Sequence, residues 1–106
     1  MSPQVFQILL SLLDGPLHGY AIIQDVATRT NDEIRLTAST LYDALSRLVD
    51  QGWIAEVESP AARVDGRDGR RRYYQLTPHG KAAAEGEAAR LERALDTARA
   101  KKLLTR

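Results

Sequence analysis

The chain has 106 residues, of which 43% are hydrophobic and 27% are charged, so it has room for one domain with one modest core. It contains no cysteine, which excludes disulfides, thiolate metal sites and a cysteine nucleophile. No apolar run is long enough to span a bilayer, so we expect a soluble cytoplasmic protein without a membrane partner.

The net charge of +1 conceals an uneven distribution along the chain. Residues 1–59 carry three basic and eight acidic side chains, whereas residues 60–74 carry five arginines and two aspartates. The residues from 75 onward carry seven basic and four acidic side chains. An acidic body with basic segments attached is typical of a protein that binds a polyanion.

Two helices are predicted before residue 31. In the first, apolar residues recur with the period of an α-helix, Pro3 suits the first turn, and Gly15-Pro16 ends the pattern. The apolar face of this helix consists of Val5, Ile8, Leu9, Leu12 and Leu13. The second helix covers residues 18–30, and its residues available to a core are Tyr20, Ile22, Ile23, Val26 and Ala27.

A third helix is predicted over residues 38–51. Thr37 is a good N-cap because its hydroxyl can accept a hydrogen bond from an unpaired backbone N–H, and Gly52 suits a left-handed C-cap. The face that we expect to be buried carries Leu41, Leu45, Leu48 and Val49. The face that we expect to be exposed carries Ser39, Thr40, Asp43, Ser46, Arg47 and Asp50.

After the third helix the apolar period changes from 3.6 to 2, which indicates strands. Residues 53–58 alternate like a partly buried strand, Ser59-Pro60 ends it, and a second strand is predicted over residues 71–76. Two Asp-Gly pairs between the strands favour turns, so we expect an antiparallel hairpin with a basic tip over residues 60–72. The side chains that share a face are Trp53, Ala55 and Val57 in one strand, and Arg72, Tyr74 and Leu76 in the other.

A last helix is predicted over residues 79–104, with Thr77 as its N-cap and Pro78 at its first position. Its apolar residues are spaced alternately by four and three, the pattern of a helix that packs along another helix. These residues are Ala84, Ala88, Leu91, Leu95 and Ala98. Because the seam is narrow and the helix leaves a small domain, we expect a second chain to cover it.

Three short helices followed by a basic hairpin is the order of elements in a winged helix-turn-helix. In that fold the third helix enters the major groove of DNA. Three segments also resemble signatures of the PadR-like family of transcriptional regulators: GPLHGY (15–20), TASTLYDALSRL (37–48) and RRYYQLTPHG (71–80). The chain departs from the family pattern at Ala38-Ser39, where Pro-Gly is frequent. We expect a mainly α fold with a small β-hairpin (α+β), consisting of a winged helix-turn-helix over residues 1–77 and a C-terminal dimerisation helix over residues 78–106.

The resemblance implies a homodimeric repressor that binds a pseudo-palindromic operator in double-stranded DNA and is released by an effector. The dimer would form through the first and last helices, by way of Val5, Ile8, Leu9, Leu12, Ala84, Ala88, Leu91, Leu95 and Ala98. Some relatives bind drugs between aromatic side chains, but the last helix of this chain has no aromatic residue. The identity of a small-molecule effector therefore stays open.

The residues expected to contact DNA are polar or basic. They are Ser39, Thr40, Tyr42, Ser46 and Arg47 on the third helix, and Arg67, Arg70, Arg71 and Arg72 in the hairpin. Hydroxyls can contact phosphates or base edges, and Arg47 is suited to a bidentate contact with guanine. Alternatives remain for some of them: Ser39 and Thr40 could cap the helix, Tyr42 could pack beneath the hairpin, and Arg72 could pair with Glu56 or Glu58.

The main alternative function is a winged-helix protein-interaction module without DNA binding, because Asp43 and Asp50 on the third helix repel phosphates. An enzyme would need a nucleophile, a base or a phosphate-binding loop, and the sequence offers none of these. His18 and His79 have no nearby ligating partners in the sequence, so we expect structural or capping roles for both. We expect neither a metal nor a cofactor.

Overall fold

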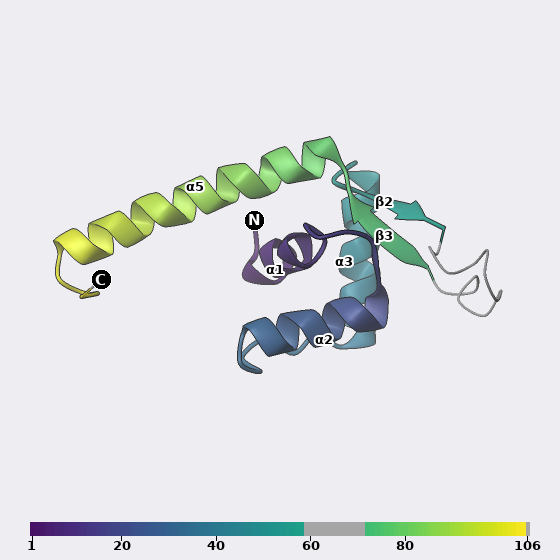
Figure 1. Ribbon diagram of the computed structural model, residues 1–106, viewed down its shortest axis with the longest axis horizontal. Helices are drawn as coiled ribbons and strands as arrows, with labels where there is room; N and C mark the ends of the chain where they lie inside the picture. The colour runs from purple at the N-terminus through teal and green to yellow at the C-terminus, as the bar shows by residue number, and fades with distance from the viewer. Residues whose placement is uncertain (59–71, 106) are drawn as a thin grey trace.

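The computed structural model describes residues 1–58 and 72–105 and has a mainly helical fold with a small antiparallel sheet (Figure 1). This confirms the predicted fold class. In chain order the elements are α1 (Pro3–Ser11), β1 (Leu17–His18), α2 (Gly19–Arg29), α3 (Ala38–Asp50), β2 (Ile54–Val57), β3 (Tyr73–Leu76) and α5 (Pro78–Ala100). The predicted basic tip, apart from Arg72, lies outside the described residues.

Each helix in the described part of the chain begins at a capping side chain, namely Ser2, His18, Thr37 and Thr77. In each case the side chain accepts a hydrogen bond of 3.0 to 3.2 Å from the backbone N–H three residues further along. The bond satisfies one of the N–H groups that a helix start leaves without a partner. The predicted caps at Thr37 and Thr77 are confirmed, and so is the capping role of His18.

The sheet has three strands in the order β1-β3-β2, with both neighbouring pairs antiparallel. The predicted hairpin is present as β2 and β3, but β1 was not predicted, since two residues are too few to show a period. Leu17 in β1 pairs with Tyr74 in the middle of β3. Strand β2 begins at Ile54, and it is Ile54, not Trp53, whose side chain is fully buried.

The core lies where the first three helices meet the sheet and the start of α5. Its buried apolar residues are Ile8, Leu9, Leu12, Ile22, Val26, Leu36, Leu41, Leu45, Leu48, Ile54, Tyr74 and Ala84. Three residues that the sequence pattern assigned to buried faces are exposed: Leu13 by 50%, Tyr20 by 63% and Val49 by 37%. Leu13 lies beyond the end of α1, where the helical period no longer applies.

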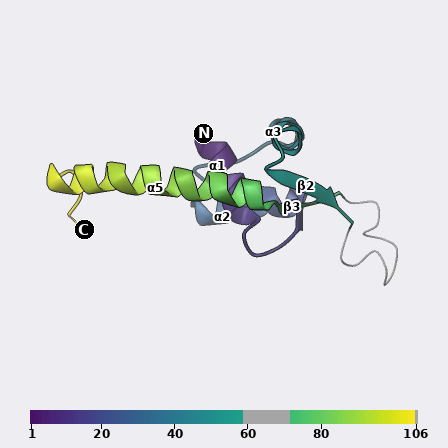
Figure 2. The same cartoon turned by 90° about the horizontal axis from the view of Figure 1, so that it is seen from above.

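Helix α5 is anchored at its first turn and then leaves the body (Figures 1 and 2). The backbone N–H of Thr77 donates to the carbonyl oxygen of Trp53 at 3.0 Å. Gly80 passes so close to Trp53 that a Cβ there would lie 1.9 Å from the same carbonyl oxygen, so only glycine fits. The helix ends at Ala100 instead of the predicted 104, and Leu91 and Leu95 on it are 37% and 42% exposed.

Within the described ranges, no helix is both long and apolar enough to cross a membrane.

Candidate nucleic-acid interface

The outer face of α3 is polar, as predicted. Leu41, Leu45 and Leu48 are almost completely buried and hold the helix on the core. All six side chains expected on the opposite face are exposed: Ser39, Thr40, Asp43, Ser46, Arg47 and Asp50. Because α3 ends at Asp50 and the left-handed Gly52 turns the chain into β2, this face stands free of the sheet.

The start of α3 carries a small hydroxyl network. Thr37 accepts a hydrogen bond from the backbone N–H of Thr40 at 3.2 Å and donates its own hydroxyl proton to the Thr40 hydroxyl at 3.0 Å. The capping residue is therefore Thr37, and Thr40 keeps a hydroxyl proton to donate to another group. The Ser39 side chain is exposed and makes no hydrogen bond with any residue that the structure describes.

Tyr42 and Arg47 lie on different flanks of α3. The phenol of Tyr42 packs against Gly19 at the start of α2, although 45% of the residue remains exposed. Arg47 lies toward α1, where it lines a hollow of about 240 Å³ together with Val5 and Trp53. Among the described residues Arg47 has no ion-pair partner, so its guanidinium is available to a ligand.

The strand side of the candidate interface contains Arg72, the one predicted hairpin arginine inside the described ranges. Its Nε lies 3.6 Å from a carboxylate oxygen of Glu56, which confirms the alternative that Arg72 pairs across the strands. Both side chains are about half exposed or more, so the pair contributes little to stability. Burial raises the pKa of the neighbouring Tyr74, and the Glu56 carboxylate raises it further, while Arg72 lowers it in part. Three predicted DNA contacts, Arg67, Arg70 and Arg71, lie outside the described residues.

One structurally central residue was not singled out from the sequence. Arg29 at the end of α2 donates to the carboxylate of Asp25 at 2.8 Å, to the backbone carbonyl oxygen of Gln7 at 2.9 Å and to the hydroxyl of Ser11 at 2.7 Å. The spacing of Asp25 and Arg29 by one helical turn was visible in the sequence, but their contact with α1 was not. This cluster ties α1 to the helix-turn-helix.

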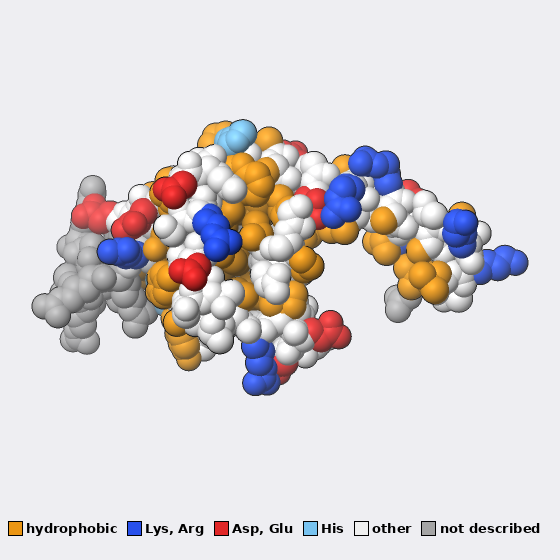
Figure 3. Space-filling view, turned by 180° about the vertical axis from the view of Figure 1, so that it is seen from behind, with side chains coloured by type: hydrophobic (Ala, Val, Ile, Leu, Met, Phe, Trp, Pro, Cys, Tyr) orange, Lys and Arg blue, Asp and Glu red, His pale blue; other side chains and the backbone are white. Residues whose placement is uncertain are grey.

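The charge on the α3 side of the molecule is mixed. Figure 3 views this side and shows carboxylates and basic side chains among uncharged groups, with no large patch of one sign. Asp43 and Asp50 contribute the acidic groups of α3 itself. Electrostatic attraction to DNA would therefore depend on basic residues outside α3.

The described residues contain no group of three or more His, Asp or Glu side chains placed to hold a metal ion.

Comparison with known proteins gives one consistent relationship. The model of the Transcriptional regulator PadR-like family matches residues 8–86. A protein called X from Lysinibacillus sphaericus is 35% identical over 71% of this chain and 65% of its own length. The chain spans less than two thirds of the length of the curated relatives that it matches.

Two solved structures extend the comparison. A PadR family transcription regulator from Clostridium difficile R20291 is 26% identical, with a TM-score of 0.76, over 97% of this chain and 100% of that chain. Bacillus subtilis PadR, solved in complex with operator DNA, is 25% identical, with a TM-score of 0.69, over 83% of this chain and 48% of that chain.

Proposed function

The chain belongs to the PadR-like family of transcriptional regulators, whose members are not enzymes, and we propose that it is a homodimeric repressor that binds a specific operator in double-stranded DNA. The observation that carries the proposal is the polar outer face of α3, which is fixed to the core by buried leucines. The complex of B. subtilis PadR with operator DNA supports the same use of the fold.

In the proposed complex, α3 enters the major groove and its side chains contact the DNA. Ser39, Thr40 and Ser46 supply hydroxyls for phosphates or base edges, and Arg47 supplies the forked donor that suits guanine. Tyr42 contributes its exposed edge, while its hydroxyl end packs on α2. Phosphate contacts fix the position of the helix on the duplex, and base contacts provide sequence preference.

The basic hairpin supplies the electrostatic part of the proposed binding. Arg67, Arg70 and Arg71 would neutralise phosphates, and each neutralised phosphate releases condensed counterions. Arg72 already pairs with Glu56, so its contribution to DNA binding would be smaller. The body of the protein is acidic, which makes these arginines the main source of attraction.

We place the dimer contact on α1 and α5, with the winged helix-turn-helix over residues 1–77 and the dimerisation helix over residues 78–106. On α5 the support is the exposed apolar seam of Ala88, Leu91 and Leu95. A hollow of about 320 Å³ beside Phe6 and Leu91 continues this apolar surface onto α1. The α1 residues expected at the interface are used within the protomer: Ile8, Leu9 and Leu12 are buried in its own core, and Val5 is half-buried.

A protein-interaction module is the second candidate, because Asp43 and Asp50 lie on the outer face of α3. The two functions differ in how binding responds to salt. For a DNA-binding protein, the logarithm of the affinity falls with the logarithm of the salt concentration, by about 0.9 per phosphate contacted. An interaction module would bind DNA weakly and equally on all sequences.

The test is fluorescence anisotropy of the full chain with DNA from upstream of its own gene, against unrelated DNA, over a salt series. The proposal expects tight binding that unrelated DNA does not displace, with a salt slope of several units. Replacing Arg47 by Ala should cost about 1 to 3 kcal/mol at one base pair of the operator. Asp50→Ala, on the same face, is the control and should not change the base preference. Weak and equal binding to both DNAs would favour the interaction module.

A further inference from the structure

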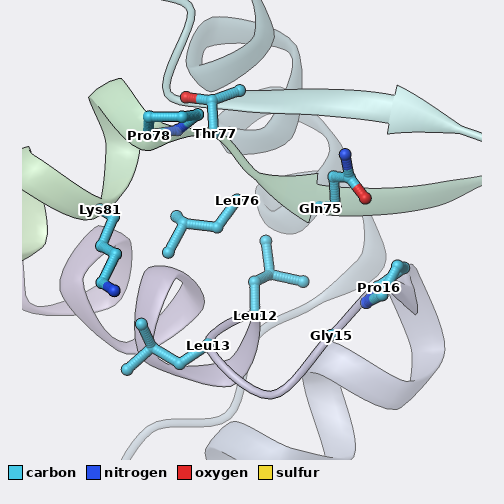
Figure 4. A pocket seen from close by; sticks show the side chains of 9 residues that line it. All are labelled: Leu12, Leu13, Gly15, Pro16, Gln75, Leu76, Thr77, Pro78 and Lys81. Carbon is cyan, nitrogen blue, oxygen red and sulfur yellow. The ribbon is translucent and has the colours of Figure 1, made fainter.

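A pocket lies between the end of α1, strand β3 and the first turn of α5, away from the proposed DNA contacts of α3 (Figure 4). Its volume of about 530 Å³ falls within the range of about 300 to 1,000 Å³ that is typical of small-molecule sites. Its apolar lining consists of Leu12, Leu13, Pro16, Leu76 and Pro78.

The apolar part of this pocket is aliphatic. Leu12 and Leu76 come from elements packed on the core, and Leu13 adds a side chain that is 50% exposed. The side chains of Leu12, Leu13 and Leu76 line the same space in Figure 4, although Leu12 and Leu13 follow the end of α1 and Leu76 is the last residue of β3. No aromatic side chain lines the pocket, so it offers no surface for stacking. An aliphatic ligand would bury its surface there against three leucines.

Among the residues that the structure describes, the polar part of the pocket contains one cation, Lys81. Thr77 is fully engaged, since it donates to the carbonyl oxygen of Gly52 at 2.6 Å and accepts from the backbone N–H of Gly80 at 3.0 Å. The side chains of Lys81 and Gln75, in contrast, have no hydrogen-bond or ion-pair partner among the described residues. An unpaired ammonium beside an aliphatic surface is complementary to a ligand with an apolar chain and a single negative charge.

We propose that this pocket binds a medium-chain aliphatic carboxylate, with the chain against the leucines and the carboxylate on the ammonium of Lys81. The ligand would contact the segment that follows α1, strand β3 and the first turn of α5 at once.

A ligand in this pocket would affect DNA binding through two elements that the proposed function uses. Helix α1 belongs to the proposed dimer contact, and β3 leads directly out of the basic hairpin. A ligand that binds both would couple the arrangement of the two protomers to the position of the hairpin. This regulatory consequence rests on the proposed function, whereas binding of the carboxylate does not.

The site is tested by isothermal titration calorimetry of the full chain, without DNA, against octanoate, octan-1-ol and octylammonium. Octanoate should bind more tightly than the alcohol, and octylammonium should bind least. Lys81→Met should weaken octanoate binding by about tenfold, the usual scale for one charge-assisted hydrogen bond at a partly exposed site, and should leave octan-1-ol binding unchanged. Lys101→Met, the same substitution at the far end of α5, should leave both affinities as they are.

Equal affinities for the three ligands, or an unchanged octanoate affinity in Lys81→Met, would overturn the site. Leu13→Asn provides a second variant, because a half-exposed residue outside any helix can be replaced without unfolding the protein. It should weaken octanoate and octan-1-ol alike. DNA anisotropy with and without octanoate then tests the regulatory consequence separately. An unchanged DNA affinity would overturn regulation by the ligand alone. Absence of DNA binding would overturn only the proposed function.

Discussion

A side chain at Gly19 would displace Tyr42, whose phenol fills the space beside the α-carbon of Gly19. A Cβ at Gly19 would lie 2.5 Å from the hydroxyl oxygen of Tyr42 and 3.3 Å from a methyl group of Leu41. Both of these residues belong to α3, so the missing side chain determines how closely α3 lies on the start of α2.

Replacing Gly19 by Ala should destabilise the protein by about 1 kcal/mol, the low end of the usual cost of overpacking, because the half-exposed Tyr42 side chain can move aside. The measurement is the urea midpoint of unfolding. Adding Tyr42→Ala should recover part of the loss, because the two substitutions act on one contact and their effects should not add. The matched control is Gly86→Ala on α5, where a Cβ meets nothing within 4 Å. That variant should be more stable, by about 1 kcal/mol.

The Arg29 cluster gives the stability of the protein a dependence on pH. Burial alone would raise the pKa of Asp25, but hydrogen bonds from Arg29 and Ser11 and the charge of Arg29 outweigh it and lower this pKa. A lowered pKa in the folded state stabilises the protein above the ordinary carboxyl pKa of about 4, and the stabilisation disappears as the pH falls through the lowered value.

Arg29→Met should therefore lower the stability at pH 7 by about 1 kcal/mol, a value reduced for the partial exposure of the cluster. The difference between variant and wild type should shrink as the pH falls below about 4, where Asp25 takes up its proton. Urea unfolding at pH 7 and at pH 3 measures both values. Arg35→Met, in an ion pair with Asp32 in which both side chains are mostly exposed, is the control. A difference that is equal at both pH values would show that Arg29 acts through packing and its bonds to Gln7 and Ser11, and not through Asp25.

The helices could be predicted because their sequence signals are local. The caps at Thr37 and Thr77 are sequence neighbours of the N–H groups that they satisfy, and Leu41, Leu45 and Leu48 repeat within one helix. Strand β1 exists only because Leu17 and His18 pair with β3, more than fifty residues further along. A pairing over this distance leaves no pattern in a segment of two residues.

The arginines of the hairpin tip are expected to set the salt dependence of DNA binding. Replacing Arg70 and Arg71 by Ala should weaken binding to all DNA sequences alike and reduce the salt slope by up to about 2 units, because two fewer phosphates are neutralised. Arg72→Ala is the matched control: since Arg72 is paired with Glu56, its removal should change the slope much less. Anisotropy titrations at several salt concentrations give both slopes. An unchanged slope in the double variant would remove the hairpin from the proposed mechanism.

The candidate site could be predicted from the sequence only in part. Exposure of the outer face of α3 follows from the helical period, which the sequence displays. The contact of Tyr42 with Gly19 and the bonds from Arg29 to α1 join residues about twenty positions apart, so they depend on how the helices pack. Ile8 and Leu9, which were expected at the dimer contact, are buried in the core of the protomer. The apolar pattern of a helix therefore does not show whether a partner or the chain itself covers that face.

The exposed apolar seam of α5 is expected to hold the proposed dimer together. Leu91 and Leu95 are 37% and 42% exposed in the protomer, so Asp at both positions should leave its fold intact while placing four charges in the apolar contact of a dimer. The expected result is a monomer in light scattering at micromolar concentration, with an unchanged circular dichroism spectrum. Ala82→Asp with Ala89→Asp adds the same charges to the opposite, exposed face of α5 and should remain dimeric. A dimer that survives Asp at both seam positions would place the interface elsewhere. Paired half-sites about 34 Å apart require two copies of α3 held together, so the monomer should also lose affinity for its operator. A monomer that bound its operator with full affinity would show that DNA binding does not depend on dimerisation.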